Sequence, residues 1–206
     1  MKKIKILSLL FCVVMLVAAC HDDEEGPIIP QPREQVGRTV LVYIVGDNGV
    51  NELSDLFKTN FEDMKEGMKE VDYSKCNLVV YSEMVNDVPR LVSLKKQNGK
   101  VVADTLFTYS EQNPLAKEVM SSVISQTVSY FPADSYGFVF LSHSSSWVPA
   151  TNDANSRSIG YYRRTQMNIP DFHDVLLSSF PRPLKFILFD SCSMLAVEVA
   201  YELRDC

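Results

Sequence analysis

The chain has 206 residues, of which 22% are charged, and its formal net charge at pH 7 is −6. An acidic chain lacks the positive field that attracts proteins to nucleic acid or to anionic lipid, so neither is an expected partner. Its five cysteines and three histidines include no CxxC pair. A zinc site built on paired ligands, or any other metal site, is therefore not expected.

The first 20 residues have the three-part plan of a secretory signal. A lysine-containing start precedes an apolar run over residues 6–17. This run is too short for a membrane-spanning helix, which needs roughly 20 apolar residues. Ala18-Ala19-Cys20 resembles the lipobox of bacterial lipoproteins, in which the cysteine is acylated and becomes the first mature residue. The alternative is an ordinary signal peptide in which Cys20 is incidental.

We therefore expect residues 1–19 to be a lipoprotein signal peptide and Cys20 to anchor the exported protein to a bacterial membrane, either the outer membrane or the cell surface. Removal of residues 1–19 takes away three lysines and no acid, which changes the net charge from −6 to −9. Residues 20–38 are acidic and then proline-rich, which predicts an extended tether. The acidic run also resembles the surface-export signal of Bacteroidetes lipoproteins, although a solvated linker would look the same.

From Thr39 onward the predicted elements alternate as in an α/β domain. Thr39–Val45 is a continuous apolar, β-branched run, typical of a strand covered on both faces. Apolar residues then recur at helical spacing over residues 51–70. Further strands are predicted over residues 77–84, 90–96, 101–107, 136–142 and 184–190, and further helices over residues 114–130, 170–179 and 194–203. This order predicts a mainly parallel sheet with helices on both faces and one hairpin turning at Asn98-Gly99, whereas residues 148–168 read as a polar loop.

Two predicted strands end in reactive side chains, His143 and Cys192. Reactive groups in open α/β sheets gather at the carboxyl ends of strands. An imidazole close to a thiol can take its proton and make it a nucleophile, so this pair predicts cysteine-based catalysis. The predicted helix after Cys192 would favour the thiolate at its amino end, and the Cys192 backbone N–H could bind an oxyanion. The alternative is a structural pair, a buried small cysteine and a satisfied histidine.

Three local sequences resemble motifs of the clostripain (C11) family of cysteine peptidases, in the family's order. They are the first-strand motif Leu41–Asn48, the histidine motif Gly137–Trp147 and the cysteine motif Phe189–Leu203. The resemblance implies a caspase-like three-layer sandwich over residues 39–206. It also implies a catalytic dyad without an obligatory third member, and a peptide or protein substrate cleaved after Arg or Lys.

Carried over residue by residue, the resemblance implies that Cys192 is the nucleophile and His143 the general base and acid. Asp190 matches an acidic position near the family's S1 pocket, where it would pair with a basic P1 side chain. Alternatively, it caps the following helix. Asp47, at the end of the first strand, could line the same S1 crevice or simply shape a turn. No cofactor is implied. Calcium dependence occurs in the family, but no acidic loop in this sequence has calcium-ligand spacing.

The sequence departs from the family pattern at Ser144. Family members typically have glycine after the histidine, and its amide contributes to the oxyanion hole, a role that here would fall to Ser144 and Cys192. Glycine matters there if the backbone needs a positive φ or a close approach to substrate. Family members also continue well beyond residue 206, so we expect a sheet that is incomplete at its C-terminal end. Both departures favour an alternative function, a surface lipoprotein that binds without turnover.

Members of the family are activated by cutting between the histidine and cysteine motifs. The predicted loop between them carries three candidate sites for self-cleavage, Arg157, Arg163 and Arg164. Arg157 is preferred because its neighbours, Asn155, Ser156 and Ser158, are small and polar. The alternative is a solvated loop with ordinary charge.

Overall fold

A six-stranded sheet forms the centre of the domain. The computed structural model describes residues 30–48, 51–149 and 157–206, and residues 31–206 form one compact unit. The strands are β1 (Arg38–Val45), β2 (Cys76–Glu83), β3 (Arg90–Gln97), β4 (Lys100–Thr108), β5 (Tyr136–Leu141) and β9 (Ile187–Asp190). The helices are α2 (Asn51–Gly67), the short 3-10 helix η1 (Met68–Glu70), α3 (Lys117–Tyr130), α4 (Ile169–Ser179) and α5 (Val197–Glu202).

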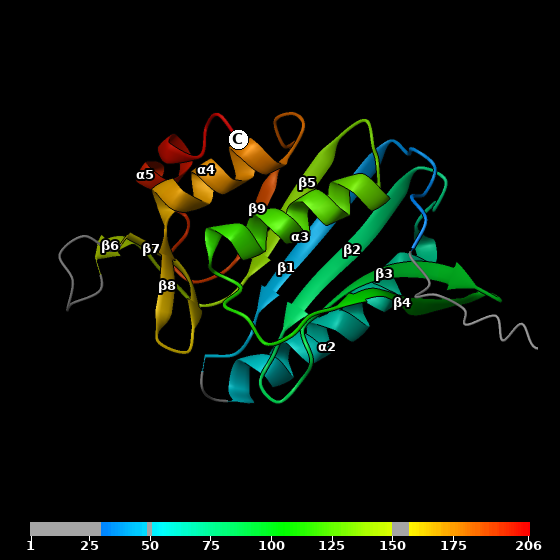
Figure 1. Ribbon diagram of the computed structural model, residues 1–206, viewed down its shortest axis with the longest axis horizontal. Coiled ribbons are helices and arrows are strands. Elements are labelled where there is room, and N and C mark those ends of the chain that lie inside the picture. The colour runs from blue at the N-terminus through cyan, green and yellow to red at the C-terminus, as the bar shows by residue number, and fades with distance from the viewer. Residues whose placement is uncertain (1–29, 49–50, 150–156) are drawn as a thin grey trace, which may run out of the picture. The chain divides into compact units, whose positions relative to one another are not determined.

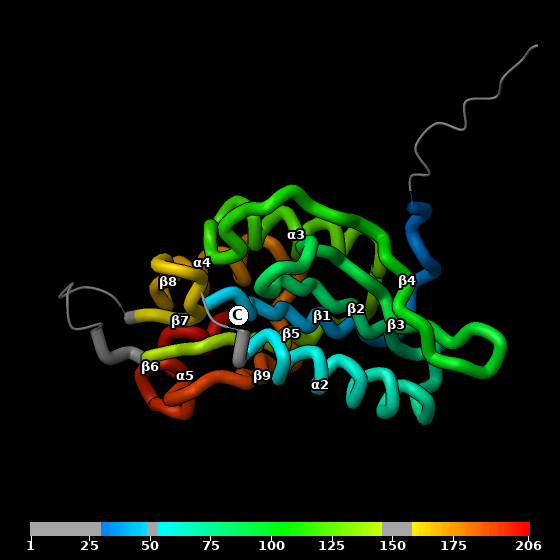
Figure 2. Tube along the Cα trace, turned by 90° about the horizontal axis from the view of Figure 1, so that it is seen from below, coloured from blue at the N-terminus to red at the C-terminus, as the bar shows by residue number. Residues whose placement is uncertain are grey.

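The sheet has the order β4-β3-β2-β1-β5-β9. β1 pairs in parallel with β2 and β5, β5 pairs in parallel with β9, and β3 and β4 are antiparallel. Helix α2 covers one face, whereas α3 and α4 cover the other (Figures 1 and 2). The predicted three-layer α/β sandwich with a mainly parallel sheet is confirmed. The predicted hairpin turn is also confirmed, because Asn98 and Gly99 have φ angles of 51° and 77°, as a type I′ turn requires.

The central strand β1 is apolar from Val40 to Val45 because both of its faces are covered. Val42 and Ile44 pack with Phe57 of α2 in one hydrophobic cluster. Leu41 and Tyr43 point to the other side and belong to the larger cluster under α3 and α4. None of the helices in the described ranges is long and apolar enough to cross a membrane.

The prediction of a loop over residues 148–168 is wrong. A second, antiparallel sheet consists of β6 (Ser144–Pro149), β7 (Arg157–Tyr162) and β8 (Thr165–Asn168), with β7 in the middle. The sheet forms because Ile159, Tyr162 and Met167 are buried within an otherwise polar stretch. Residues 150–156, which join β6 to β7, lie outside the described residues.

The last part of the predicted tether packs against the folded unit. Arg33 donates its backbone N–H to the Tyr130 carbonyl at 2.9 Å, and its guanidinium lies 4.9 Å from the centre of the Phe131 ring. Val36 forms a bridge with Ala133. Residues 31–37 therefore belong to the folded unit, whereas the predicted signal peptide, Cys20 and the rest of the tether up to residue 29 lie outside the described residues.

A buried carboxylate, Glu83, lies at the carboxyl end of β2. The Glu83 side chain is 2% exposed, and its Oε2 has no hydrogen-bond partner among the described residues. Burial, together with the negative charge of Asp47 nearby, raises the pKa of Glu83 to about 7. The folded protein therefore holds the Glu83 proton more tightly than the unfolded chain does.

We expect Glu83→Gln to flatten the pH dependence of stability. The wild-type protein keeps the full contribution of protonated Glu83 below pH about 4.5 and loses it as the pH rises through about 7. At about 1.4 kcal/mol per pKa unit, this loss is on the order of 1–3 kcal/mol of unfolding free energy. Urea unfolding at pH 5 and pH 8 measures it, with the exposed Glu70→Gln as control. The same pH slope in Glu83→Gln as in the wild type would contradict the prediction.

Candidate active site

The two predicted catalytic residues lie at adjacent strand ends. In the parallel pair of β5 and β9, Leu141 is opposite Asp190. His143 and Cys192 each follow these residues by two positions, and both side chains are exposed. Neighbouring strands lie about 4.8 Å apart, so the register brings an imidazole and a thiol to the same edge of the sheet.

Cys192 lies on a sharp turn between β9 and a buried anchor. Ser193 has a φ angle of 59°, in the left-handed region, and Met194 directly after it is buried. On the other flank, the Ser142 backbone N–H donates to the Asp190 carbonyl at 3.4 Å. Ser191 Oγ is buried and has no hydrogen-bond partner within the described part of the chain. The turn therefore exposes the Cys192 thiol between Asp190, whose carbonyl is hydrogen-bonded, and Met194, whose side chain is buried.

Two expectations about this turn are wrong. Helix α5 begins at Val197, five residues after Cys192, and its N-cap is Ala196. A helix amino end acts only within its first turn, so it does not stabilise a Cys192 thiolate. Asp190 is not the N-cap of this helix either. The predicted helix is shorter because residues 193–196 leave β9 in a turn that buries Met194.

Asp190 faces the α2 side of the sheet and is exposed. Its Oδ2 accepts a hydrogen bond from Asn60 Nδ2 of α2 at 3.3 Å. An exposed carboxylate two residues from Cys192 is available to a cationic ligand. Asn60 was not predicted, because nothing in the sequence separates it from other polar residues on an amphipathic helix.

Asp47 is buried and has a different partner. Its Oδ2 accepts a hydrogen bond from Arg163 Nε at 2.8 Å, and its carbonyl accepts from the Arg163 backbone N–H at 2.9 Å. Arg163 also forms an ion pair with Glu111. The structure thus brings the predicted S1 residue Asp47 together with a predicted cleavage site, on the far side of β5 from Cys192.

The other two cleavage candidates occupy different settings. Arg164 follows Arg163 in the turn between β7 and β8 and makes no ion pair with any described residue. Arg157 is the first residue of β7, directly after residues that the structure does not describe.

The serines on both sides of His143 contact β7. Ser142 Oγ accepts a hydrogen bond from the Tyr161 backbone N–H at 3.1 Å, and Ser144 Oγ accepts one from the Gly160 N–H at 3.4 Å. Ser144 is not among the residues with positive φ, so its backbone does not require glycine on conformational grounds.

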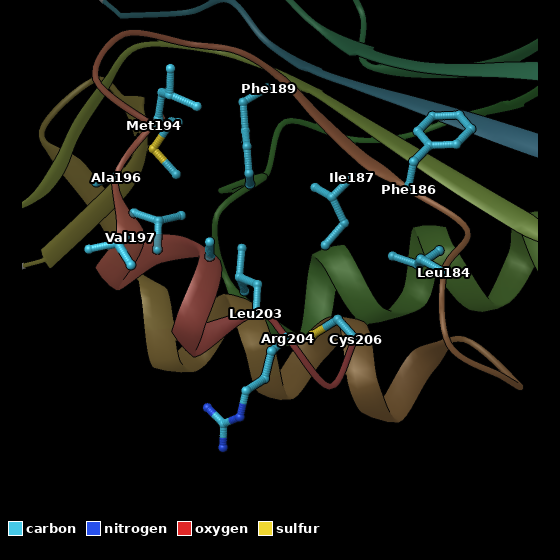
Figure 3. Close-up of a pocket in the computed structure, with 13 residues that line it drawn as sticks. Leu184, Phe186, Ile187, Phe189, Met194, Ala196, Val197, Leu203, Arg204 and Cys206 are labelled. Atoms are coloured by element: carbon cyan, nitrogen blue, oxygen red, sulfur yellow. The ribbon is translucent and has the colours of Figure 1, made fainter.

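A groove of about 600 Å³ lies between β9 and α5, beside the Cys192 turn (Figure 3). Apolar side chains dominate its lining, including Phe186, Phe189, Met194 and Val197. Of the described residues that line the groove, Arg204 alone is charged, and it would repel a basic side chain. The groove is therefore unsuited to a cationic P1 residue, whereas the exposed carboxylate of Asp190 would attract one.

A second hollow, of about 420 Å³, lies beside Asp47 and Arg163. Acidic side chains line it, among them Glu83 and Glu111. No group of three or more His, Cys, Asp or Glu within the described ranges is arranged to hold a metal ion. Two of the acidic groups that line the hollow, Asp47 and Glu111, form ion pairs with the guanidinium of Arg163.

Three solved structures that this chain resembles are of proteases. A secreted C11 cysteine protease from Bacteroides thetaiotaomicron, solved in complex with an irreversible peptide inhibitor, is 42% identical, with a TM-score of 0.72 over 82% of this chain and 46% of its own. An inactive zymogen C11 protease from Parabacteroides distasonis is 34% identical, with a TM-score of 0.70 over 84% of this chain and 47% of its own. The chain thus spans about half the length of these two relatives.

A third structure, of a B. fragilis cysteine protease, is 42% identical, with a TM-score of 0.52 over 57% of this chain and 97% of its own. Comparison with proteins of curated function gave no match. The model of the clostripain family matches residues 42–206, which include the ends of β1, β5 and β9. The chain belongs to the clostripain family.

Proposed function

We propose that this protein is a cysteine endopeptidase that cleaves after Arg or Lys, with Cys192 as nucleophile and His143 as general base and acid. The observation that carries the proposal is the pair of exposed reactive side chains at adjacent carboxyl ends of β5 and β9. The related B. thetaiotaomicron protease, solved with a peptide inhibitor, supports a peptide substrate.

In the proposed reaction His143 accepts the proton of Cys192 Sγ, and the thiolate attacks the carbonyl carbon of the scissile bond. The backbone N–H groups of Ser144 and Cys192 stabilise the oxyanion. His143 then protonates the leaving amine, and water hydrolyses the thioester to release the second product and restore the thiol.

Asp190 is the residue we assign to recognition of the basic P1 side chain. It is exposed, it lies on the strand that leads to Cys192, and its contact with Asn60 leaves carboxylate lone pairs for a guanidinium or ammonium group. The second predicted S1 residue, Asp47, is less suited because its carboxylate already binds Arg163.

Covalent labelling tests the proposed nucleophile. An irreversible peptide probe with Arg or Lys at P1 should label the wild-type protein and leave Cys192→Ala unlabelled. Without its base, His143→Ala should react about 10²–10⁴-fold more slowly. Cys76→Ala and Cys206→Ala, which remove the other described thiols, are matched controls that should label normally.

Labelling that survives in Cys192→Ala would exclude Cys192 as the nucleophile. An unlabelled wild-type protein would instead favour the alternative function, a surface protein that binds without turnover, which is suggested by Ser144 at the family's glycine position.

The same probe tests Asp190. Asp190→Asn should slow labelling about 10- to 100-fold with the basic probe and little with a neutral-P1 probe, because only the former forms a charged pair. The exposed Asp63→Asn serves as control.

We further propose self-cleavage after Arg157. The B. fragilis structure supports a two-chain form, because 57% of this chain accounts for nearly all of that solved chain. The Parabacteroides relative, described as an inactive zymogen, supports activation from a precursor. Arg157 is preferred to Arg163, whose guanidinium is bound by Asp47 and Glu111.

Gel analysis with N-terminal sequencing of the fragments tests this cleavage. The wild type and Arg164→Gln should separate into two chains, whereas Arg157→Gln and Cys192→Ala should each stay in one. A catalytically active wild-type preparation that remains a single chain would contradict self-cleavage.

The location of the protein is proposed from its first 20 residues, with export supported by a relative described as secreted. We propose a lipid anchor at Cys20 that holds the protein at the outer membrane or cell surface. Cys20→Ala should move the protein from the membrane fraction to the soluble fraction, since acyl chains supply the attachment. A Cys76→Ala control should stay in the membrane fraction. Unchanged membrane retention of Cys20→Ala would exclude the anchor.

A further inference from the structure

The segment that carries His143 is held by β7. Beyond the hydrogen bonds of Ser142 and Ser144 to the β7 backbone, Ser145 Oγ hydrogen-bonds Ser158 Oγ. The residue before His143 and the two residues after it are therefore all tied to one strand, which belongs to the second sheet. Any movement of β7 along or away from these serines displaces the backbone of His143.

The position of β7 is in turn fixed against the main sheet at its middle. Gly160 has a φ angle of 74°, and a Cβ there would lie 2.5 Å from a methyl of Leu115 and 2.9 Å from the Phe140 ring. The β7 backbone thus packs directly on β5, three residues before His143. Ile159 beside it is fully buried.

The end of β7 is fixed by Arg163. This residue has a φ angle of 52°, which a non-glycine residue adopts only when other contacts favour it. Its backbone N–H and its Nε both donate to Asp47, its second guanidinium contact is Glu111, and the guanidinium lies 5.0 Å from the centre of the Tyr162 ring. Asp47 lies two residues after the end of β1, so its ion pair with Arg163 joins the main sheet to the second sheet.

We propose that Asp47 and Arg163 are positioning residues for His143, which act through β7 and its hydrogen bonds to the serines around the histidine. The inference rests on the proposed function, in which His143 is the general base. It also assigns Asp47 a role other than recognition of the P1 side chain.

The proposed cut after Arg157 makes this contact more important. Asp47 would lie on the first chain of a cleaved protein and Arg163 on the second, because the cut follows the first residue of β7. The ion pair would then keep β7 on the His143 segment after its covalent link to β6 is lost. If the segment around His143 could move freely, proton transfer between Cys192 and His143 would be impaired, because a displacement of about 1 Å can lower a rate on the order of 100-fold.

The test compares Arg163→Gln with Arg164→Gln in the full-length protein. These variants remove the same charge from neighbouring positions of one turn, but only Arg163 contacts Asp47. For hydrolysis of a peptide substrate with Arg or Lys at P1, we expect kcat to fall about 10- to 100-fold in Arg163→Gln with KM changed less than twofold, and neither constant to change in Arg164→Gln. Asp47→Asn should resemble Arg163→Gln, and the double variant should lose no more than either single one.

A purely structural role is separated from positioning by two further readouts. Arg163→Lys, which keeps the charge, should recover at least part of the lost kcat. The NMR signals of the His143 imidazole, assigned with His143→Ala, should shift in Arg163→Gln and stay in place in Arg164→Gln, whether or not the protein turns over substrate. Circular dichroism at the assay temperature establishes that each variant is folded.

The proposal is overturned if the kcat of folded Arg163→Gln equals that of Arg164→Gln, or if its His143 signals are unchanged. It is also overturned if folded Arg163→Lys loses as much kcat as Arg163→Gln. An inactive wild type whose His143 signals still respond to Arg163→Gln would overturn the proposed function and leave the positioning intact, so the two failures are distinguishable.

Discussion

The register between β5 and β9 determines what the rest of the molecule can do. Backbone hydrogen bonds place Leu141 opposite Asp190, and side chains alternate along each strand, so a slip of one residue would turn Asp190 from the α2 face to the core. The core prevents this slip, because Phe140 and Phe189 belong to the apolar cluster under α4. The same packing that stabilises the sheet therefore also sets the positions of His143 and Cys192.

Most of the main sheet could be predicted from the sequence, because buried parallel strands are recognisable as continuous apolar runs. The positions of His143 and Cys192 at strand ends followed from the same runs. The second sheet was missed because β7 places isolated apolar residues among polar ones. Ile159, Tyr161 and Tyr162 directly before the two arginines are nevertheless typical of a short strand that ends in a turn.

The partners of the candidate site residues had no comparable signal. Arg163 lies 116 residues from Asp47 in sequence, and Asn60 lies 130 residues from Asp190. Nothing local to either member of such a pair indicates the other. This explains why Asp47 and Asp190, which look alike as aspartates after buried strands, were given the same role. The structure pairs the buried Asp47 with Arg163 and leaves Asp190 exposed, two residues before Cys192.

The order of the sheet gives the two reactive residues unequal support. β5 is hydrogen-bonded on both sides, to β1 and β9, whereas β9 is the outermost described strand and pairs only with β5. Leu188 of β9 is 51% exposed, so the strand also has less apolar cover than its neighbour. Local opening costs least free energy where hydrogen bonds and buried contacts are fewest. Among the described strands, His143 therefore follows one that is hydrogen-bonded on both sides, whereas Cys192 follows one that is hydrogen-bonded on a single side.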